Sequence, residues 1–376
     1  MDNVLFLAKT RNFLEFISSY FNHRDEKGTN IDSNELPFFI KLSKHHSLTA
    51  LLYQALMTAK VNVDEEILRK LEEYYLHNLR KCVLFDKERN ELFSYLNENK
   101  IDYLPLKGII LKDYYLDPYT REFADNDILF FNKDSASIKA FFVDRDYDVK
   151  LYKRGNDDVY IKKPFYNFEM HRSLFAYRVD NKNIVRYFEN YLSKSNKIDN
   201  YEHYLSKEDF YIYFLAHSYK HYHVSGCGIR TLIDIYLYLK KEQLDFNYVN
   251  EELKKLDLLD FSNKIINLSN KVFNNEALSE EEEQMLLFIA SSGTYGTLEH
   301  SVDKGVEEHG KFGYFMYRLF PPFISYKTTH PWAYKCPFLI PFAWFDRFFR
   351  YSFKNPKHAS SELKMISKQK NREKNK

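Results

Sequence analysis

Two aspartates, Asp125 and Asp127, lie two residues apart in the segment ADNDILFF. On a β-strand, side chains at positions i and i+2 project from the same face, so the two carboxylates would lie close together and repel each other. A hard cation such as Mg²⁺ relieves that repulsion and takes waters or substrate phosphate oxygens as its other ligands. Pairs of this kind are common on protein surfaces, but the apolar run directly after this one indicates a buried strand. The pair is therefore a candidate metal site for phosphoryl chemistry.

The segment FYNFEMHRSL offers further groups for the same site. Glu169 would supply a third carboxylate if this segment pairs with the strand that carries the aspartates. Three carboxylates could hold two ions that clamp the attacking and leaving oxygens of a phosphoryl displacement. His171 would share the strand face of Glu169, where it could contact substrate or assist proton removal. A hydrogen-bonded structural histidine fits the same position equally well.

Lys107 and Gly108 lie at a strand-to-helix junction upstream of the aspartates. Glycine lets the backbone approach a phosphate closely, and a helix N-terminus presents N–H groups and a positive dipole end to it. Lys107 could add a point charge, and Arg121 offers a planar fork suited to bidentate phosphate contact. The alternative interpretation is that Gly108 is an ordinary turn glycine and that Lys107 and Arg121 are solvated cations. The nearby acids favour the phosphate-binding interpretation over this one.

Two histidines, His217 and His221, are spaced i, i+4 in the helical segment HSYKHYH. That spacing can bind zinc, but no cysteine or acidic residue at matching spacing completes a tetrahedral set. A substrate-facing role for the pair is implied by the resemblance of this block to part of a known family, and not by the spacing. Arg230 and Asp234 have the same spacing, which predicts an ion pair on the surface of the next helix.

The elements that must position these groups follow from hydrophobic periodicity. Alternating or short apolar runs predict strands in IDYLPLKG, DNDILFF, YDVKLYKR, DDVYIKK and FYNFEMHRSL, and three- and four-residue steps predict helices before and after them. The fold class expected is α+β. The predicted divisions are an N-terminal helical region (1–95), a small mixed-sheet unit (96–178), a helical domain (179–290), an aromatic and basic region (291–353) and a polar basic tail expected to be disordered (354–376).

Several blocks together resemble a known family. The pattern L-K-G-x-x-L, then a tyrosine-rich turn with D-P and R, then D-x-D before apolar residues, is similar to the uncharacterised bacterial nucleotidyltransferase family of the DNA polymerase β superfamily. FEMHRSL, the histidine-rich block followed by GIRTLIDIYLYL, and SSGTYGT add to the resemblance, which covers roughly residues 40–350.

The resemblance implies a nucleotidyltransferase palm with Asp125, Asp127 and Glu169 as metal ligands and Gly108 in the loop that holds the nucleotide phosphates. It implies Mg²⁺ or Mn²⁺, an NTP (ATP being the expected one), and transfer of the NMP to a hydroxyl or phosphate of a small molecule, a glycan precursor or a protein. The phosphate loop of the superfamily usually reads Gly-Ser, whereas Ile109 follows Gly108 here. Lys107 is the obvious substitute for the missing hydroxyl.

Composition limits the other possibilities. The chain has 376 residues, 44% of them hydrophobic, and a formal net charge of +2, which makes long nucleic acid an unexpected partner. Three widely separated cysteines, no recognisable signal peptide and no long apolar run predict a cytoplasmic protein. The aromatic and basic stretch 321–353 either packs on the helical domain or contacts a membrane surface. A degenerate nucleotide-binding protein or a membrane-surface scaffold is therefore the alternative to an enzyme.

Overall fold

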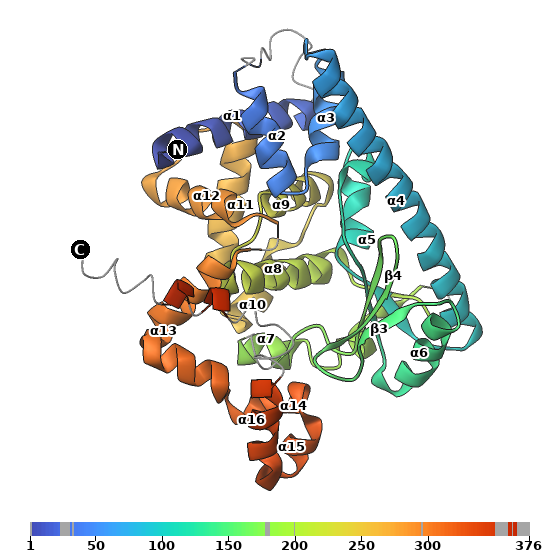
Figure 1. The fold of residues 1–376 in the computed structure, drawn as a ribbon. Helices are drawn as coiled ribbons and strands as arrows, with labels where there is room; N and C mark the ends of the chain where they lie inside the picture. Colours follow the sequence, from blue (N-terminus) through green and yellow to red (C-terminus); the bar gives the residue numbers. More distant parts are fainter. Residues whose placement is uncertain are drawn as a thin grey trace.

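The computed structural model describes residues 2–22, 31, 34–176, 181–198, 200–294, 296–349, 360–362 and 364–366. Most of these residues are helical, and a five-stranded sheet lies beside the long helix α4 (Glu65–Glu98), at the right of Figure 1. Helix α4 begins after Asp64, whose carboxylate accepts hydrogen bonds from the backbone N–H groups of Glu66 and Ile67. The expected α+β class, with a mixed sheet among helices, agrees with this architecture.

All five predicted strand segments form strands of that sheet. The strands are β1 (Tyr103–Pro105), β2 (Asn126–Phe130), β3 (Asp148–Leu151), β4 (Asp157–Lys162) and β5 (Tyr166–His171). Their order is β1-β2-β5-β4-β3; β2 and β5 are parallel and the remaining neighbours are antiparallel. The sheet is therefore mixed, with the two acid-bearing segments side by side.

One face of the sheet is covered by α4 and α6 (Ser135–Val143). Ile128 and Phe130 of β2, with Phe168 and Met170 of β5, join Leu92 and other residues of these helices in one fully buried cluster. Burying an apolar side chain of this size contributes roughly 1.5–3 kcal/mol. Because side chains alternate along a strand, packing these residues against the helices directs the intervening ones to the opposite face. The intervening residues include Asp127 on β2 and Glu169 on β5, so both carboxylates lie on that opposite face.

The helices before and after the sheet share a second, larger core. They are α1 (Asn3–Asn22), α2 (Leu36–His45), α3 (Thr49–Thr58), α8 (Lys207–Val224), α9 (Arg230–Lys241), α10 (Phe246–Lys255), α11 (Leu259–Phe273) and α12 (Glu280–Ser292). Buried residues from α1–α3 and from α8–α12 belong to one hydrophobic cluster, and α1 packs directly on α11 and α12. The two helical regions that periodicity treated separately are thus joined through a common core.

The remaining elements are mostly short, apart from α13. They are α5 (Gly108–Leu111), η1 (Lys112–Tyr114), η2 (Pro118–Thr120), η3 (Asn132–Asp134), α7 (Lys182–Tyr187), η4 (Tyr191–Lys194), β6 (Asn196–Lys197), β7 (His203–Tyr204), α13 (Leu298–Leu319), η5 (Phe323–Ser325), α14 (Tyr326–Thr329), α15 (Pro331–Lys335), η6 (Pro337–Leu339) and α16 (Ile340–Phe349). Most of the predicted tail 354–376 lies outside the described residues. Among the described helices, none combines the length and the apolar character needed to cross a membrane.

His46 connects three segments of the larger core. Its side chain is fully buried; Nδ1 accepts a hydrogen bond from the backbone N–H of Ile229 at 3.2 Å, and Nε2 lies 2.9 Å from the carbonyl oxygen of Ala290. These contacts require the neutral imidazole with its proton on Nε2. Burial lowers the pKa of His46 to about 3, because a charged imidazole is disfavoured away from water.

We expect His46 to make the protein less stable in mild acid. The pKa in the folded state lies below the ordinary value of 6.5, so the unfolded chain binds a proton more readily between pH 3 and 6.5, and stability falls as pH drops through this window. At pH 5 the loss is about 2 kcal/mol. Urea unfolding of the wild type and His46→Gln at pH 5 and pH 7.5 measures it: the pH dependence should be smaller in the variant. An unchanged dependence would contradict the neutral assignment.

Candidate active site

Asp127 and Glu169 face each other across the parallel strands β2 and β5. The register pairs Asp127 with Glu169 and Leu129 with His171. Oxygens of the two carboxylates and a ring nitrogen of His171 all lie within 4.8 Å of one another, a spacing that can hold a metal ion. The predicted pairing of the Glu169 segment with the strand after Asp125 is therefore present, and His171 joins the cluster.

Asp127 is held by two hydrogen bonds to the same oxygen. Lys107 Nζ and His171 Nε2 each lie 2.7 Å from Asp127 Oδ1, and the Asp127 side chain is almost fully buried. The amide nitrogen of Asn156 lies 3.5 Å from His171 Nδ1, which favours the tautomer that donates through Nε2. Burial would raise the pKa of Asp127, but Lys107 and His171 hold it well below its ordinary value. Asp127 is thus a charged carboxylate at neutral pH.

Lys107 reaches Asp127 from an unusual backbone conformation. Its φ of 46° and ψ of −115° lie outside the regions that side chains other than glycine ordinarily occupy. Burial would lower the pKa of Lys107, but the charge of Asp127, with smaller contributions from Tyr213 and Asp125, raises it above its ordinary value. Strained residues of this kind cluster at functional sites, where the surrounding structure holds them in place.

Asp125 directly precedes β2, which begins at Asn126. Its carboxylate is outside the compact group of Asp127, Glu169 and His171 but remains electrostatically linked to it. Burial and the charge of Asp127 raise the pKa of Asp125, while Lys107 and Arg230 oppose the shift. Burial, Asp127 and Asp125 likewise raise the pKa of Glu169 to about 8. The three acids therefore destabilise one another when all are ionised.

The loop before β2 is fixed by buried polar contacts. Arg121 donates from Nε and Nη2 to the two carboxylate oxygens of Asp234, each at 2.8 Å, and the hydroxyl of Tyr115 donates to the same Asp234 at 2.9 Å. The expected ion pair between Arg230 and Asp234 is wrong: Arg230 donates to the carbonyl oxygen of Glu122 instead. Two of the three guanidinium nitrogens of Arg121 thus serve to position the loop, and its predicted phosphate contact stays a prediction.

Gly108 lies against the third nitrogen of that guanidinium. A Cβ atom at Gly108 would come within 2.9 Å of Arg121 Nη1, so a larger residue would displace the guanidinium. Helix α5, which Gly108 begins, has only four residues, and the N–H of Ile109 in its first turn already donates to the carbonyl oxygen of Leu106. The group that the Gly108 backbone approaches closely in this structure is the Arg121 guanidinium. Its predicted contact with a phosphate remains a prediction.

Helix α8 presents a stripe of three side chains at four-residue spacing toward the acids. Tyr213 is fully buried and interacts electrostatically with Lys107, Asp127 and Glu169. His217 and His221 follow, with their Nε2 atoms 2.9 Å apart. Burial lowers the pKa of His217 well below its ordinary value and that of His221 to about 3, so both rings are neutral. Among the described residues, the three-ligand cluster found is that of Asp127, and neither of these histidines belongs to it.

The donor set suits a hard divalent cation. Asp127 and Glu169 offer carboxylate oxygens on one strand face, and Asp125 adds negative charge next to them. The raised pKa values of Asp125 and Glu169 show that the folded protein disfavours their full ionisation, which is the condition that a bound cation relieves. The residues therefore fit a site for Mg²⁺ or Mn²⁺.

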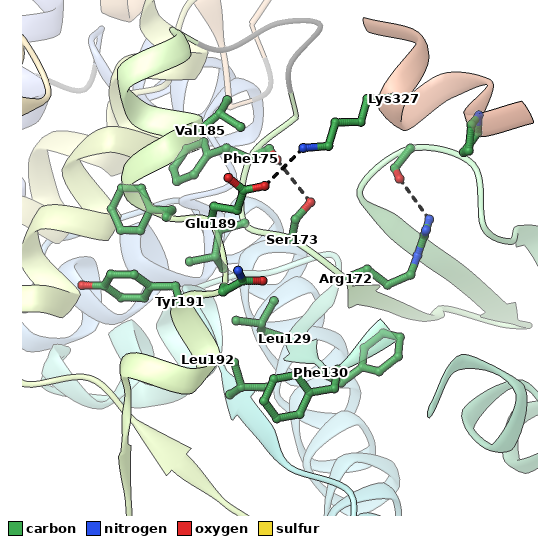
Figure 2. Close-up of a pocket in the computed structure, with 16 residues that line it drawn as sticks. Leu129, Phe130, Arg172, Ser173, Phe175, Val185, Glu189, Tyr191, Leu192 and Lys327 are labelled. Atoms are coloured by element: carbon green, nitrogen blue, oxygen red, sulfur yellow. Dashed lines mark hydrogen bonds and ion pairs between the residues drawn. The ribbon is translucent and has the colours of Figure 1, made fainter. Parts of the chain in front are cut away.

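A cavity of about 430 Å³ opens at the carboxyl ends of β2 and β5 (Figure 2). The segments 129–131 and 172–175 form one wall, residues of 185–192 another, and Lys327 and Pro331 of the C-terminal region a third. The lining is largely apolar and aromatic. Lys327 Nζ pairs with Glu189 Oε1 at 3.2 Å, which links the C-terminal region to the wall opposite it.

Sequence reasoning missed Tyr213, Asp234 and the double hydrogen bond on Asp127. Tyr213 lies four residues before His217, so the same helical spacing that singled out the histidines could have indicated it. Asp234 had a charged neighbour at i−4 and was assigned to it, although its partner lies 113 residues away in sequence. No local pattern reveals such a long-range pair.

A comparison with protein-family models identifies the class of this chain. The model described as "uncharacterised nucleotidyltransferase" matches residues 32–274, which is more than half of the chain and contains every predicted site residue. The chain belongs to this nucleotidyltransferase family. Membership supports a general nucleotidyl-transfer activity. Neither the search of curated proteins nor the search of solved structures found a match.

Proposed function

We propose that this protein uses a divalent cation, Mg²⁺ or Mn²⁺, to transfer an NMP from an NTP to a hydroxyl or phosphate acceptor. The observation that carries the proposal is the alignment of Asp127 with Glu169 on parallel strands, with Asp125 next to them and Lys107 bonded to Asp127. Such a group of acids fits the family to which the chain belongs, because nucleotidyl transfer requires neutralisation of phosphate charge.

In the proposed mechanism, Asp125, Asp127 and Glu169 would hold the cation, and the chemistry it would supply is neutralisation of phosphate charge. Lys107 orients Asp127 and adds a positive charge beside the phosphates. His171 fixes the Asp127 carboxylate from the other side. Tyr213 of α8 limits the access of water to this group, because its side chain is fully buried. Positioning and charge compensation, rather than covalent chemistry, would provide the rate enhancement.

The cavity at the ends of β2 and β5 is our proposed position for the acceptor. Leu129 in its wall shares the strand face of Asp127 two residues along β2, and it pairs with His171, which contacts Asp127. The apolar lining with charged groups at Arg172, Glu189 and Lys327 fits an acceptor that has an apolar or ring-shaped body and a polar group.

NTP binding should require the acids. We expect the wild type to bind Mg²⁺–ATP or another Mg²⁺–NTP in calorimetry, and Asp125→Ala/Asp127→Ala to lose at least about tenfold in affinity, because these carboxylates would hold the cation of the Mg²⁺–NTP complex. Asp144→Ala/Asp148→Ala removes two exposed carboxylates from the same unit and is the matched control. Asp125→Asn is the milder variant if the double variant unfolds. Equal binding by all four proteins would contradict the site assignment.

Turnover is tested separately. Incubation of the wild type with each labelled NTP and a cell extract, followed by mass analysis, should reveal a species that gains an NMP and the release of pyrophosphate. A protein that binds Mg²⁺–NTP through these acids and yields no modified species would be the degenerate nucleotide-binding alternative. The missing hydroxyl after Gly108 is the observation that keeps this alternative in the experiment.

A further inference from the structure

The C-terminal helices carry apolar side chains on their outer surface. Helix α13 leads to a small group formed by α14, α15 and α16, at the bottom of the view in Figure 1. The inner contacts of this group are modest: Tyr326, Ala333 and Ala343 form its own small buried cluster. Apart from Tyr326, most of the large aromatic side chains of this group are exposed.

Helix α16 has an inverted distribution of apolar residues. Phe342, Phe345 and Phe349 are 64%, 64% and 56% exposed, and their spacing of three and four residues places them along one stripe of α16. Phe338, in the short η6 just before this helix, is 91% exposed. The small residue Ala343 is fully buried on the inner side. A helix on the surface of a water-soluble domain normally shows the opposite arrangement, with polar residues outside. The stripe is therefore suited to an apolar environment.

The second half of α13 continues this surface. Phe312, Phe315 and Met316 are exposed there, and Phe320 at the end of the helix meets the Trp344 ring edge-on, with centroids 4.9 Å apart. We call the exposed apolar side chains of α13, of the residue that follows it, of η6 and of α16 the aromatic face; its members are Phe312, Phe315, Met316, Phe320, Phe338, Phe342, Trp344, Phe345, Phe348 and Phe349. Exposed apolar groupings of this kind on a soluble chain mark interaction sites.

Charge is concentrated in the same part of the sequence. Residues 321–376 contain 12 Lys or Arg and 3 Asp or Glu, a net charge of +9, so the first 320 residues carry −7 within the total of +2. The face is thus joined to a strongly basic segment on an otherwise acidic protein. Aromatic insertion combined with basic residues is the combination that binds membranes with anionic lipid headgroups.

We propose that the aromatic face docks this protein on an anionic phospholipid surface. Phenylalanine side chains enter the boundary between headgroups and acyl chains, and the basic residues of 321–376 are attracted to the negative headgroups. A second copy of the chain would cover the apolar stripe equally well but would bring its own positive segment alongside, which the net charge of +9 disfavours. The proposal is independent of the proposed transferase activity.

The two tryptophans of the chain provide an intrinsic probe. Trp332 and Trp344 both lie in the C-terminal group and are 45% and 37% exposed. Vesicles of phosphatidylcholine with about 30 mol% phosphatidylglycerol should shift their fluorescence to the blue and carry the protein upward in a flotation gradient. Pure phosphatidylcholine vesicles should bind at least about fivefold less, and raising NaCl from about 0.1 M to about 0.5 M should weaken binding to the anionic vesicles.

Substitutions test whether vesicle binding depends on the aromatic face or on exposed apolar side chains in general. Phe338→Ser/Phe342→Ser/Phe345→Ser should lower the vesicle partition coefficient by about tenfold or more. The matched control Val4→Ser/Leu76→Ser/Ile198→Ser removes three exposed apolar side chains from elsewhere and should change it less than about twofold. Circular dichroism melting verifies that both variants fold.

Two results would overturn the proposal. One is the absence of a blue shift and of flotation with anionic vesicles, or equal flotation of the triple variant and the wild type. The other combines two observations: the wild type does not bind vesicles, and light scattering shows that it forms a concentration-dependent dimer that the triple variant does not form. This result would assign the face to a second copy of the chain.

Discussion

Replacing Asp127 by asparagine should lower nucleotidyl transfer by about a thousandfold and should also destabilise the fold by about 3–5 kcal/mol. The first effect follows from the loss of a proposed cation ligand. The second follows because Asp127 is the buried partner of Lys107 and His171, with both donors at 2.7 Å from one oxygen. An uncharged amide would leave the ammonium of Lys107 without its counter-ion in a buried site. Urea unfolding and label transfer from NTP measure the two losses.

A second substitution separates the two effects. Asp127→Asn/Lys107→Met removes the buried ammonium together with its partner, so we expect it to regain most of the lost free energy of unfolding but none of the transfer activity. Asp148→Asn, which changes an exposed aspartate of the same sheet, is the control and should alter neither quantity. Retained transfer by Asp127→Asn would exclude Asp127 as an essential ligand.

Replacing Glu169 by glutamine should have the opposite effect on stability. The neighbouring acids and burial raise the pKa of Glu169 to about 8, above the ordinary 4.5 of the unfolded chain. The folded state therefore holds a proton that the unfolded state releases between pH 4.5 and 8, and stability is lost as pH rises through this window. Glu169→Gln removes this loss, so it should be more stable than the wild type by about 2 kcal/mol at pH 8 and nearly equal at pH 4.5. Its transfer activity should fall by about a hundredfold or more.

Added metal provides the contrasting measurement. A cation that binds the folded state raises the melting temperature, and we expect millimolar Mn²⁺ or Mg²⁺ to do so for the wild type and much less for Glu169→Gln. Such a gain of stability with loss of function is typical of active-site carboxylates that repel one another. If Glu169→Gln is less stable than the wild type at pH 8, the mutual repulsion of the acids is not a feature of the folded protein.

The sequence allowed the sheet to be predicted because its strands carry strong local patterns. The apolar run after Asp127 and the alternation around Glu169 indicated two strands, and the i, i+2 rule indicated which side chains share a face. Their pairing was an assumption that the register of β2 and β5 supports, and the parallel orientation of the two strands was not predicted. The α+β class followed from the change of period near residue 101.

Contacts between distant segments could not be derived in this way. Arg121 is not a solvated cation but forms a buried ion pair with Asp234. His46 forms hydrogen bonds with the backbone of Ile229 and Ala290 because the N-terminal and the later helices share one core. Such partners are selected by three-dimensional packing, which leaves no periodic signal in either segment. The assignment of Asp234 to Arg230 was wrong for this reason: a favourable local spacing does not exclude a better distant partner.

The hydrogen bond between Lys107 and Asp127 has a consequence for the order of assembly. An internal ammonium already compensates Asp127, so a free cation gains less by binding this acid than it would at an uncompensated carboxylate. A triphosphate would give Lys107 a second anionic partner and would leave Asp127 more available to the cation. Metal and nucleotide should therefore bind with positive cooperativity, and by reciprocity each must raise the affinity of the other by the same factor. Lys107 would then lower the affinity of the acids for a free cation until a nucleotide binds.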